Sequence, residues 1–373
     1  MTRARARSEL RSVVLAGGGT AGHVSPLLAT AEALLRRDPG TRITVLGTAE
    51  GLEARLVPEA GHELRVLPRV PLPRRASVDL LRVPGRLLAA VGAAARVLTD
   101  VDADVVVGFG GYVSTPAYLA ARRARLPLVV HEQNALPGLA NRVGARLTPW
   151  VATTFAGTRL RGARHVGLPL RAAVAGLDRA ALRGQARADL GLHPHRTTLL
   201  VTGGSLGAQR LNEVLPAAGA DLAAAGVQVL HVSGRGKQVR APLRADGEPP
   251  YVVVPYVDRM DLAYAACDAV LCRSGAGTVC ELSALGIPAA YVPLPVGNGE
   301  QRRNAEPLVA AGGGLLVADA DLSTAWVRGT LLPLLGDPVR LAAMAAAARA
   351  HGVLDAADRL ADVVVRAATG GTP

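Results

Sequence analysis

Aromatic residues and lysine are scarce in this chain of 373 residues. Aromatic side chains make up 3% of it, and Lys237 is its single lysine, so arginine carries nearly all of the positive charge. Proteins that bind single-stranded nucleic acid rely on aromatic side chains as stacking platforms. The composition therefore argues against a nucleic-acid partner.

Cysteine is rare as well, and long apolar runs are lacking. Cys267, Cys272 and Cys280 are odd in number and lack C-x-x-C spacing, so we expect small buried hydrophobes in a reducing compartment. Two Asp-x-Asp patterns, 102–104 and 319–321, lie at the start of a strand and before a helix, and we assign no metal. No apolar run reaches the ~20 residues that span a bilayer, and the one after Arg11 is too short for a signal peptide. We expect the protein to stay in the cytoplasm.

Positive charge is distributed unevenly along the chain. Residues 1–170 hold 23 arginines against 12 acidic residues, whereas the remainder is nearly balanced, and the net charge is +12. Such a surplus favours an anionic partner for the front half: membrane lipid, phosphate or nucleic acid, of which the scarce aromatic residues disfavour a single-stranded nucleic acid.

Apolar strands alternate with helices in two similar series. The first begins with a strand at 13–16 and a helix from about 25 to 37, and the second with a strand at 198–202 and a helix at 208–225. Alternation with continuous apolar strands is typical of parallel, doubly wound sheets. The sequence predicts an α/β fold with two Rossmann-like domains that face a cleft, at 1–168 and 169–350, followed by a C-terminal helix at 351–373.

The first glycine turn, Gly17-x-Gly19-x-x-Gly22, matches the dinucleotide fingerprint, but a lone match is weak. Gly47-Thr48-Ala49, at the end of the next strand, has no acidic residue to hold a nicotinamide ribose, and Glu50 and Glu53 come later. His23, directly after the turn, would point into the cleft as a general base. The alternative is a histidine that caps the helix.

A second glycine-rich stretch, Arg273-Ser274-Gly275-Ala276-Gly277-Thr278-Val279-Cys280-Glu281, follows an apolar strand at 268–271. Glycines let backbone N–H groups approach a pyrophosphate, which the start of a helix favours electrostatically. Glu281, about one turn into the helix, is placed to accept hydrogen bonds from a ribose diol. An ordinary strand-to-helix turn with a buried polar end is the alternative.

Polar residues follow other predicted strands. His131-Glu132-Gln133-Asn134 comes directly after the strand at 128–130, and we expect all four side chains at the cleft mouth because a structural role for all four is hard to find. Gly110-Gly111-Tyr112 follows the preceding strand, and a polar run that contains Gln301 follows a strand of the second half.

The segment 79–98 is amphipathic, and Pro84-Gly85 interrupts it. One interpretation is a surface helix packed on the sheet. The other is an interfacial patch whose leucines enter lipid while its arginines meet anionic headgroups. The basic front half favours the patch, whose members are Leu80, Leu81, Arg82, Arg86, Leu87 and Leu88.

These motifs together resemble the MurG family of peptidoglycan N-acetylglucosaminyltransferases. The resemblance covers about residues 12–310 in the order of the family. Its motifs are Gly18-Gly19-Thr20-Ala21-Gly22-His23-Val24, Gly110-Gly111-Tyr112-Val113-Ser114, His131-Glu132-Gln133-Asn134, Gly203-Gly204-Ser205-Leu206-Gly207-Ala208, Ser233-Gly234-Arg235-Gly236, the stretch from Arg273 to Glu281, and Gln301.

The resemblance implies the two-domain GT-B glycosyltransferase fold. It implies that the domain at 1–168 binds the acceptor and the membrane, that the domain at 169–350 binds the donor, and that the helix at 351–373 returns to the first domain. It also implies inverting transfer of GlcNAc, without metal or cofactor, from UDP-GlcNAc to the MurNAc 4-hydroxyl of undecaprenyl-pyrophosphoryl-MurNAc-pentapeptide (lipid I), which forms lipid II. It places the enzyme peripherally at the cytoplasmic face of the plasma membrane, and allows cell-wall and division proteins as partners.

Residue roles follow from the same resemblance. His23 is the candidate base, and Tyr112 and Glu132 lie on the acceptor side. Glu281 would hold the ribose, the backbone of Val257 would contact uracil, and Gln301 and Asn134 would bind the donor sugar. The diphosphate and the loop that faces it would involve Arg171, Ser205, Ala276, Gly277, Thr278, Val279, Cys280, Thr20, Ala21 and Gly22.

Four other functions stay open. A UDP-GlcNAc 2-epimerase of the same fold needs no lipid, so the leucine-arginine segment disfavours it. A glycolipid synthase would use diacylglycerol as its acceptor. A nicotinamide-dependent oxidoreductase would bind NADH. A non-catalytic nucleotide-sugar sensor would leave His23 and the 131–134 motif without a task.

Overall fold

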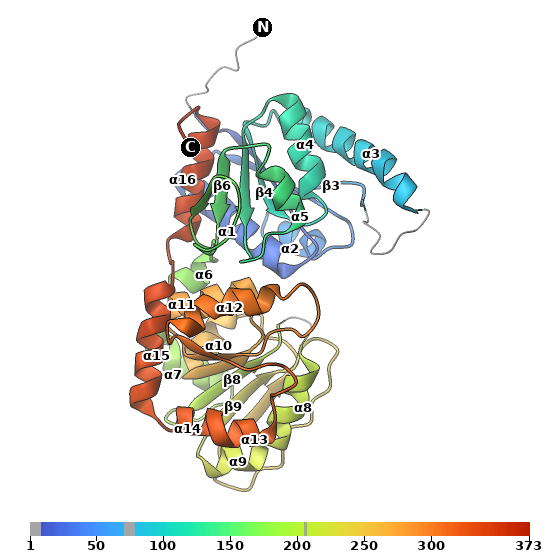
Figure 1. Ribbon diagram of the computed structural model, residues 1–373. Coiled ribbons are helices and arrows are strands. Elements are labelled where there is room, and N and C mark those ends of the chain that lie inside the picture. The colour runs from blue at the N-terminus through green and yellow to red at the C-terminus, as the bar shows by residue number, and fades with distance from the viewer. Residues whose placement is uncertain (1–8, 71–78, 205–206) are drawn as a thin grey trace. The chain divides into compact units, whose positions relative to one another are not determined.

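Two parallel β-sheets organise the chain (Figure 1). The computed structural model describes residues 9–70, 79–204 and 207–373, apart from the side chains of residues 21 and 79–81. Contacts divide the chain into a first unit, Met1–Arg171 with Leu354–Pro373, and a second unit, Ala172–Val353.

The sheet of the first unit has seven strands, and each neighbouring pair is parallel. In spatial order they are β3 (Glu63–Val66), β2 (Arg42–Gly47), β1 (Ser12–Gly17), β4 (Val105–Gly110), β5 (Leu128–Glu132), β6 (Trp150–Thr153) and β7 (Ala163–His165). The helices are α1 (Ala21–Arg37), α2 (Glu53–Glu59), α3 (Asp79–Asp100), α4 (Ser114–Ala124), α5 (Leu139–Gly144) and α16 (Ala356–Ala368).

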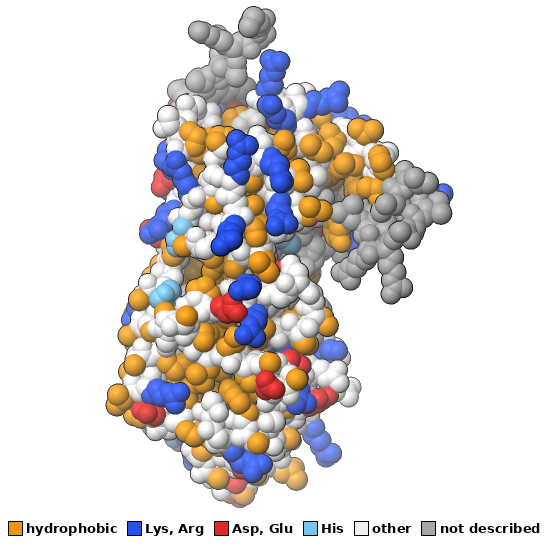
Figure 2. All heavy atoms as spheres, in the orientation of Figure 1, with side chains coloured by type: hydrophobic (Ala, Val, Ile, Leu, Met, Phe, Trp, Pro, Cys, Tyr) orange, Lys and Arg blue, Asp and Glu red, His pale blue; other side chains and the backbone are white. Residues whose placement is uncertain are grey.

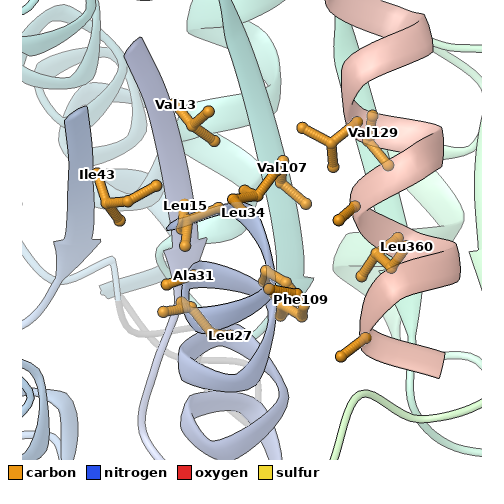
Figure 3. Close-up of a cluster of buried hydrophobic side chains, with 14 of the residues drawn as sticks. Val13, Leu15, Leu27, Ala31, Leu34, Ile43, Val107, Phe109, Val129 and Leu360 are labelled. Carbon is orange, nitrogen blue, oxygen red and sulfur yellow. The ribbon is translucent and has the colours of Figure 1, made fainter. Parts of the chain in front are cut away.

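Alternation along β1 explains why helices cover both faces of this sheet. Val13 and Leu15 belong to a cluster with apolar residues of α1 and α16, which Figure 3 shows. Val14 and Ala16, which point the other way, belong to a cluster with α3 and α4. A strand buried on both faces reads as a continuous apolar run, as this one does.

Three expectations for the first unit were wrong. Helix α1 begins at Ala21 and not near residue 25, because Thr20 is extended and its carbonyl already accepts from the N–H of Val24 at 3.2 Å. Helix α3 continues through Pro84 instead of being interrupted there. Strand β5 extends to Glu132, because its last residues pair with β6, a strand that the sequence pattern does not predict.

The second unit has a six-stranded sheet whose neighbouring strands are also parallel. In spatial order they are β10 (Tyr251–Val254), β9 (Gln228–Val232), β8 (Thr198–Thr202), β11 (Ala269–Cys272), β12 (Ala289–Tyr291) and β13 (Gly314–Leu316). The helical segments are α6 (Ala172–Ala175), α7 (Arg179–Asp189), α8 (Gln209–Ala217), α9 (Gly219–Ala224), α10 (Met260–Ala266), α11 (Ala276–Leu285), α12 (Glu300–Ala310), α13 (Thr324–Trp326), the π-helical η1 (Val327–Leu331), α14 (Leu332–Leu335) and α15 (Pro338–His351).

One predicted helix of the second unit is two. The expected helix at 208–225 breaks at Ala218 into α8 and α9. Gly219 begins α9 where a Cβ would lie 2.5 Å from Cγ of Pro242 and 2.8 Å from its Cβ, so the close approach of Pro242 requires glycine there. Leu211 and Leu222 still pack into the same core, because each short helix presents its own apolar face to the sheet.

The strand order reverses at one point in each sheet. In the first unit β1 lies between β2 and β4, and in the second unit β8 lies between β9 and β11. In open parallel sheets, ligands bind at the carboxyl ends of the strands at such a switch point. The two glycine turns singled out in the sequence follow β1 and β11, which places each of them at the switch point of its own sheet.

Candidate active site

The turn after β1 leads into α1, whose third residue is His23. Gly19 lies in the left-handed region with φ +89°, and Thr20 leads into α1. Nδ1 of the half-buried His23 lies 3.0 Å from Oγ1 of Thr20. Desolvation lowers the pKa of the His23 imidazole to about 4. The Glu53 carboxylate and the hydrogen bond to the Gly18 backbone raise this pKa, but by less than desolvation lowers it. The imidazole is therefore neutral near pH 7, as a general base must be.

The turn after β4 packs directly against His23. Gly110 has φ +94°, and a Cβ there would lie 3.1 Å from Nε2 of His23 and 3.3 Å from Nδ2 of Asn141. At Gly111, with φ +85°, a Cβ would lie 2.7 Å from the carbonyl oxygen of Gly18. Glycine is needed at both positions, and the two turns at the switch point of the first sheet are therefore in contact.

The 131–134 motif was expected at the cleft mouth because a structural role for its four side chains was hard to find, and that reason was wrong. His131, Glu132 and Gln133 are buried, and only Asn134 is partly exposed. A structural role exists for Glu132: its carboxylate accepts from the N–H groups of Asn134 (2.8 Å) and Gly138 (3.0 Å) and from the amide of Asn141 (2.9 Å). Buried charge requires such partners.

His131 has a structural role too. Its Nε2 lies 2.9 Å from the carbonyl oxygen of Gly167, and burial lowers its pKa to about 4. Asn141, which the sequence pattern did not single out, joins these groups: its amide nitrogen donates to the carbonyl of His131 at 3.1 Å, and its oxygen accepts from Tyr118 at 2.7 Å. Hydrogen bonds from the 131–134 motif therefore hold the turn between Asn134 and α5 in place.

Tyr112 borders a pocket of about 150 Å³ beside the first glycine turn. Its side chain is 46% exposed, and the guanidinium carbon of Arg69 lies 5.8 Å from its ring centroid. Arg69 pairs with Glu50 at 2.7 Å. The remaining lining residues come from the turns after β1, β2 and β4, and are Gly18, Gly19, Thr48, Gly51 and Val113.

In the second unit, the turn after β11 opens α11. Gly275 is the extended residue before the helix, so the N–H groups of Ala276, Gly277 and Thr278 lie in its first turn. Such a helix start favours an anion. Arg273, behind the turn, forms an ion pair with Asp319 at 2.5 Å and donates to the carbonyl of Val292 at 3.1 Å.

Glu281 lies in the second turn of α11 and is half-buried. Its Oε2 accepts a hydrogen bond of 2.7 Å from the hydroxyl of Tyr264, a buried residue of α10. Tyr264 was not predicted from the sequence, because nothing in the local pattern distinguishes it from an apolar core residue.

The other predicted donor residues are placed separately. Gln301, in the first turn of α12, accepts from the N–H of Leu294 at 3.0 Å. Val257 lies between β10 and α10, and Arg171 is exposed at the end of the first unit. Val279 is buried and Cys280 is partly exposed. Ser205 lies outside the described residues, as do the side chains of Ala21, Leu80 and Leu81.

The described part of the amphipathic segment is the helix α3. Leu88 is 69% exposed and Arg82 is exposed, whereas Leu87 and Arg86 are half-buried. Figure 2 shows hydrophobic side chains on the surface where α3 lies, and Lys and Arg side chains gathered on the face of the first unit that is in view. Among the described residues, no single helix has the length and apolarity to cross a membrane, and Thr324–Leu335 with Pro338–Ala368 meets that test only as a bent pair.

Comparison with known proteins gives matches over nearly the whole chain. The N-terminal domain of glycosyltransferase family 28 matches residues 13–153, and its C-terminal domain matches residues 198–360. A protein of Nocardioides sp. is 60% identical over 361 residues, which cover 96% of this chain and 99% of its own. A protein of Streptomyces avermitilis is 57% identical over 355 residues, covering 95% and 98%. Both are named UDP-N-acetylglucosamine--N-acetylmuramyl-(pentapeptide) pyrophosphoryl-undecaprenol N-acetylglucosamine transferase.

Solved structures of glycosyltransferases also superpose on this chain. MurG of Acinetobacter baumannii superposes with a TM-score of 0.76 at 28% identity, over 95% of this chain and 99% of that one. A calicheamicin glycosyltransferase superposes with a TM-score of 0.68 at 20% identity, over 96% and 99%, and this likeness shows the fold alone.

Two doubly wound parallel sheets, each with a glycine turn at its switch point, define a glycosyltransferase of GT-B architecture, which confirms the predicted fold class. Sequence identity narrows the class further. The chain belongs to glycosyltransferase family 28, and within it to the MurG family.

Proposed function

We propose that this enzyme transfers GlcNAc from UDP-GlcNAc to the 4-hydroxyl of the MurNAc unit of lipid I, with inversion at the anomeric carbon, and so forms lipid II. The observation that carries the proposal is the full-length identity of 55–60% to proteins named for this transfer. The base of the first unit and the donor groups of the second unit support it.

His23 is the proposed base. Its neutral imidazole would accept the proton of the 4-hydroxyl while the hydroxyl oxygen bonds to the anomeric carbon and the bond from that carbon to UDP breaks. Oγ1 of Thr20 contacts Nδ1, and we assign the proton to Nε2, the nitrogen that lies next to Gly110. A positioned base typically contributes about 100- to 10,000-fold in rate.

The donor groups belong to the second unit, apart from Arg171, Asn134 and the loop at 20–22 that would face the diphosphate. Glu281 would accept hydrogen bonds from the ribose hydroxyls, and the backbone of Val257 would contact uracil. The leaving UDP gains negative charge, which the N–H groups that start α11 can stabilise because they are fixed before the reaction begins. Arg171 would add a formal charge, and Gln301 and Asn134 would hold the sugar.

Membrane association is the other part of the proposal. The lipid acceptor requires the enzyme to work at a bilayer, and we place it peripherally at the cytoplasmic face, where UDP-GlcNAc is available. The exposed Leu88 and the arginines of α3 would contact lipid and anionic headgroups.

Transfer of radiolabelled GlcNAc to purified lipid I tests the proposed reaction. We expect labelled lipid II and released UDP. Donor alone should give no UDP-ManNAc, the isomer that a 2-epimerase would produce, and diacylglycerol should accept no sugar. NADH fluorescence should not change on adding the enzyme. Label in a diacylglycerol product, or no label in lipid II, would contradict the proposal.

A further inference from the structure

Glu53, the first residue of α2, is a charged residue buried beside the His23 turn. Its side chain is 0% exposed. Its Oε2 accepts from the N–H of Gly19 at 2.8 Å, and its Oε1 accepts from the N–H of Thr48 at 2.9 Å and from the hydroxyl of Thr48 at 2.7 Å. The carboxylate therefore joins the turn after β1 to the turn after β2.

Glycines enclose this carboxylate. A Cβ at Gly18 or at Gly51 would overlap its oxygens, and a Cβ at Gly47 would lie 2.5 Å from its Cγ. Desolvation raises the pKa of Glu53, but the hydrogen bonds from Gly19 and Thr48 outweigh it, so the pKa lies below its usual value. The Glu53 carboxylate is therefore a buried anion that the turns after β1 and β2 enclose and hydrogen-bond.

The bond to Gly19 has two consequences for the turn. It fixes the peptide that precedes Thr20, whose hydroxyl contacts Nδ1 of His23. It also occupies the Gly19 N–H with a carboxylate of the protein itself. The turn has the spacing of the dinucleotide fingerprint, but its Gly19 N–H, which would face a pyrophosphate in a dinucleotide site, already donates to Glu53.

Glu53 is also the charged group whose field reaches the imidazole. The other neighbours of the imidazole are uncharged. They are Thr20 and the backbone of Gly18 in the turn before α1, Gly110 at the end of β4 and, beyond Gly110, Asn141. A negative charge at this place stabilises the imidazolium relative to the imidazole, so Glu53 offsets part of the effect of burial.

We propose that Glu53 is a positioning residue for the base: its carboxylate holds the 18–20 turn in the conformation that places His23, and stabilises the imidazolium that forms when His23 accepts the proton of the acceptor hydroxyl. This rests on the proposed function, in which His23 is the base. Glu53 itself does not contact the reacting atoms.

The substitution Glu53→Gln tests this proposal, because it keeps the shape of the side chain and removes its charge and one acceptor. We expect kcat for lipid I to fall about 10- to 100-fold, part of the contribution of a positioned base. The KM for UDP-GlcNAc should stay within about twofold, because the donor groups belong mainly to the other unit. Glu59→Gln is the matched control: Glu59 ends the same helix, is exposed, and pairs with Arg55, so kcat should not change.

A double-mutant cycle separates this role from a merely structural one. If Glu53 acts through His23, then Glu53→Gln lowers the residual kcat of His23→Ala by less than about twofold. A structural role would lower kcat equally in both backgrounds, and this result would overturn the proposal. So would an unchanged kcat in the single variant.

If Glu53→Gln does not fold, a second variant still tests the proposal. Thr48→Val removes one hydrogen bond to Glu53 without changing any charge, and we expect kcat to fall about 3- to 10-fold with unchanged binding of UDP. Unchanged kcat in this variant would overturn the proposal if Glu53→Gln cannot be purified. If the wild type itself transfers no GlcNAc to lipid I, the proposed function fails, whereas active wild type with fully active variants rejects Glu53 alone.

Discussion

The hydroxyl of Tyr264 lies 2.7 Å from Oε2 of Glu281 and donates a hydrogen bond to it. Tyr264 is buried on α10, so the bond fixes the carboxylate from the protein interior. Carboxylates that bind a ribose diol need both oxygens correctly oriented, and an outer partner of this kind supplies the orientation.

Replacing Tyr264 with phenylalanine should therefore weaken donor binding. We expect the KM for UDP-GlcNAc and the Kd for UDP to rise about 3- to 10-fold with little change in kcat, since the lost bond involves a charged acceptor. Tyr291→Phe is the control, because the buried hydroxyl of Tyr291 has no hydrogen-bond partner among the described residues. Equal effects of the two substitutions on UDP binding would contradict the role of Tyr264.

Glu281 itself should matter more than its partner. We expect Glu281→Gln to raise the Kd for UDP about tenfold or more, measured by calorimetry, because a charged acceptor for the ribose is lost. The 2′-deoxyribose analogue of UDP should bind wild type more weakly than UDP, and this difference should shrink in the variant. Unaltered binding of UDP by Glu281→Gln would remove Glu281 as the ribose ligand.

His23→Ala should affect turnover and not donor binding. We expect kcat to fall about 100- to 10,000-fold, the range for a general base, while the KM for UDP-GlcNAc changes little. The pKa of His23 is lowered to about 4. In wild type, the loss of kcat that protonation of His23 causes on acidification should therefore be centred near pH 4 and not near 6.5. Unchanged turnover in the variant would exclude His23 as the base.

The sequence was sufficient for the features that depend on local pattern. Continuous apolar strands and glycine turns predicted two doubly wound sheets, and strand β8 has the predicted bounds, 198–202. The roles of Glu53 and Glu132 could not be predicted in this way. The bond between Gly19 and Glu53 joins residues 34 positions apart, and periodicity within a single helix or strand carries no information about such a pair.

Burial of the 131–134 motif was missed for a related reason. A cluster of polar residues after an apolar strand suggests a solvent-facing site, but β6 continues the sheet beyond β5 and buries His131 and Glu132 between neighbouring elements. Their hydrogen-bond partners, Gly167 and Asn141, come from later segments. One signal was present in the sequence: Asn141 is a polar residue close to the motif, the third residue of the following helix α5.

Buried histidines should make stability depend on pH. Burial lowers the pKa of His131 and of His231 to about 4, and Tyr251 and Asn212 flank the ring of His231. Because the unfolded chain binds more protons than the folded one between about pH 6.5 and 4, stability is fully present above this range and falls as the pH drops through it. Each histidine contributes at most about 3 kcal/mol to this loss.

Urea unfolding at a series of pH values measures this effect. We expect the free energy of unfolding to fall steadily from pH 6.5 to 4.5, and the slope for the second unit to decrease in His231→Gln, which cannot be protonated there. A flat profile over this range would show that the buried imidazoles do not take up protons on unfolding.

The exposed leucine of α3 provides a test of membrane binding. Leu88 is 69% exposed beside the half-buried Leu87, and a side chain that enters lipid contributes about 0.8 kcal/mol for each buried CH₂. We expect Leu88→Ser to lower the affinity for vesicles of anionic lipid about 3- to 30-fold, while activity on a soluble short-chain acceptor stays unchanged. Leu243→Ser is the control, because Leu243 is 95% exposed but belongs to the second unit and not to the basic first half of the chain. Equal loss of vesicle binding in both variants would indicate a nonspecific effect of surface apolarity, and loss of activity on the soluble acceptor would indicate that α3 serves the fold of the first unit and not the bilayer.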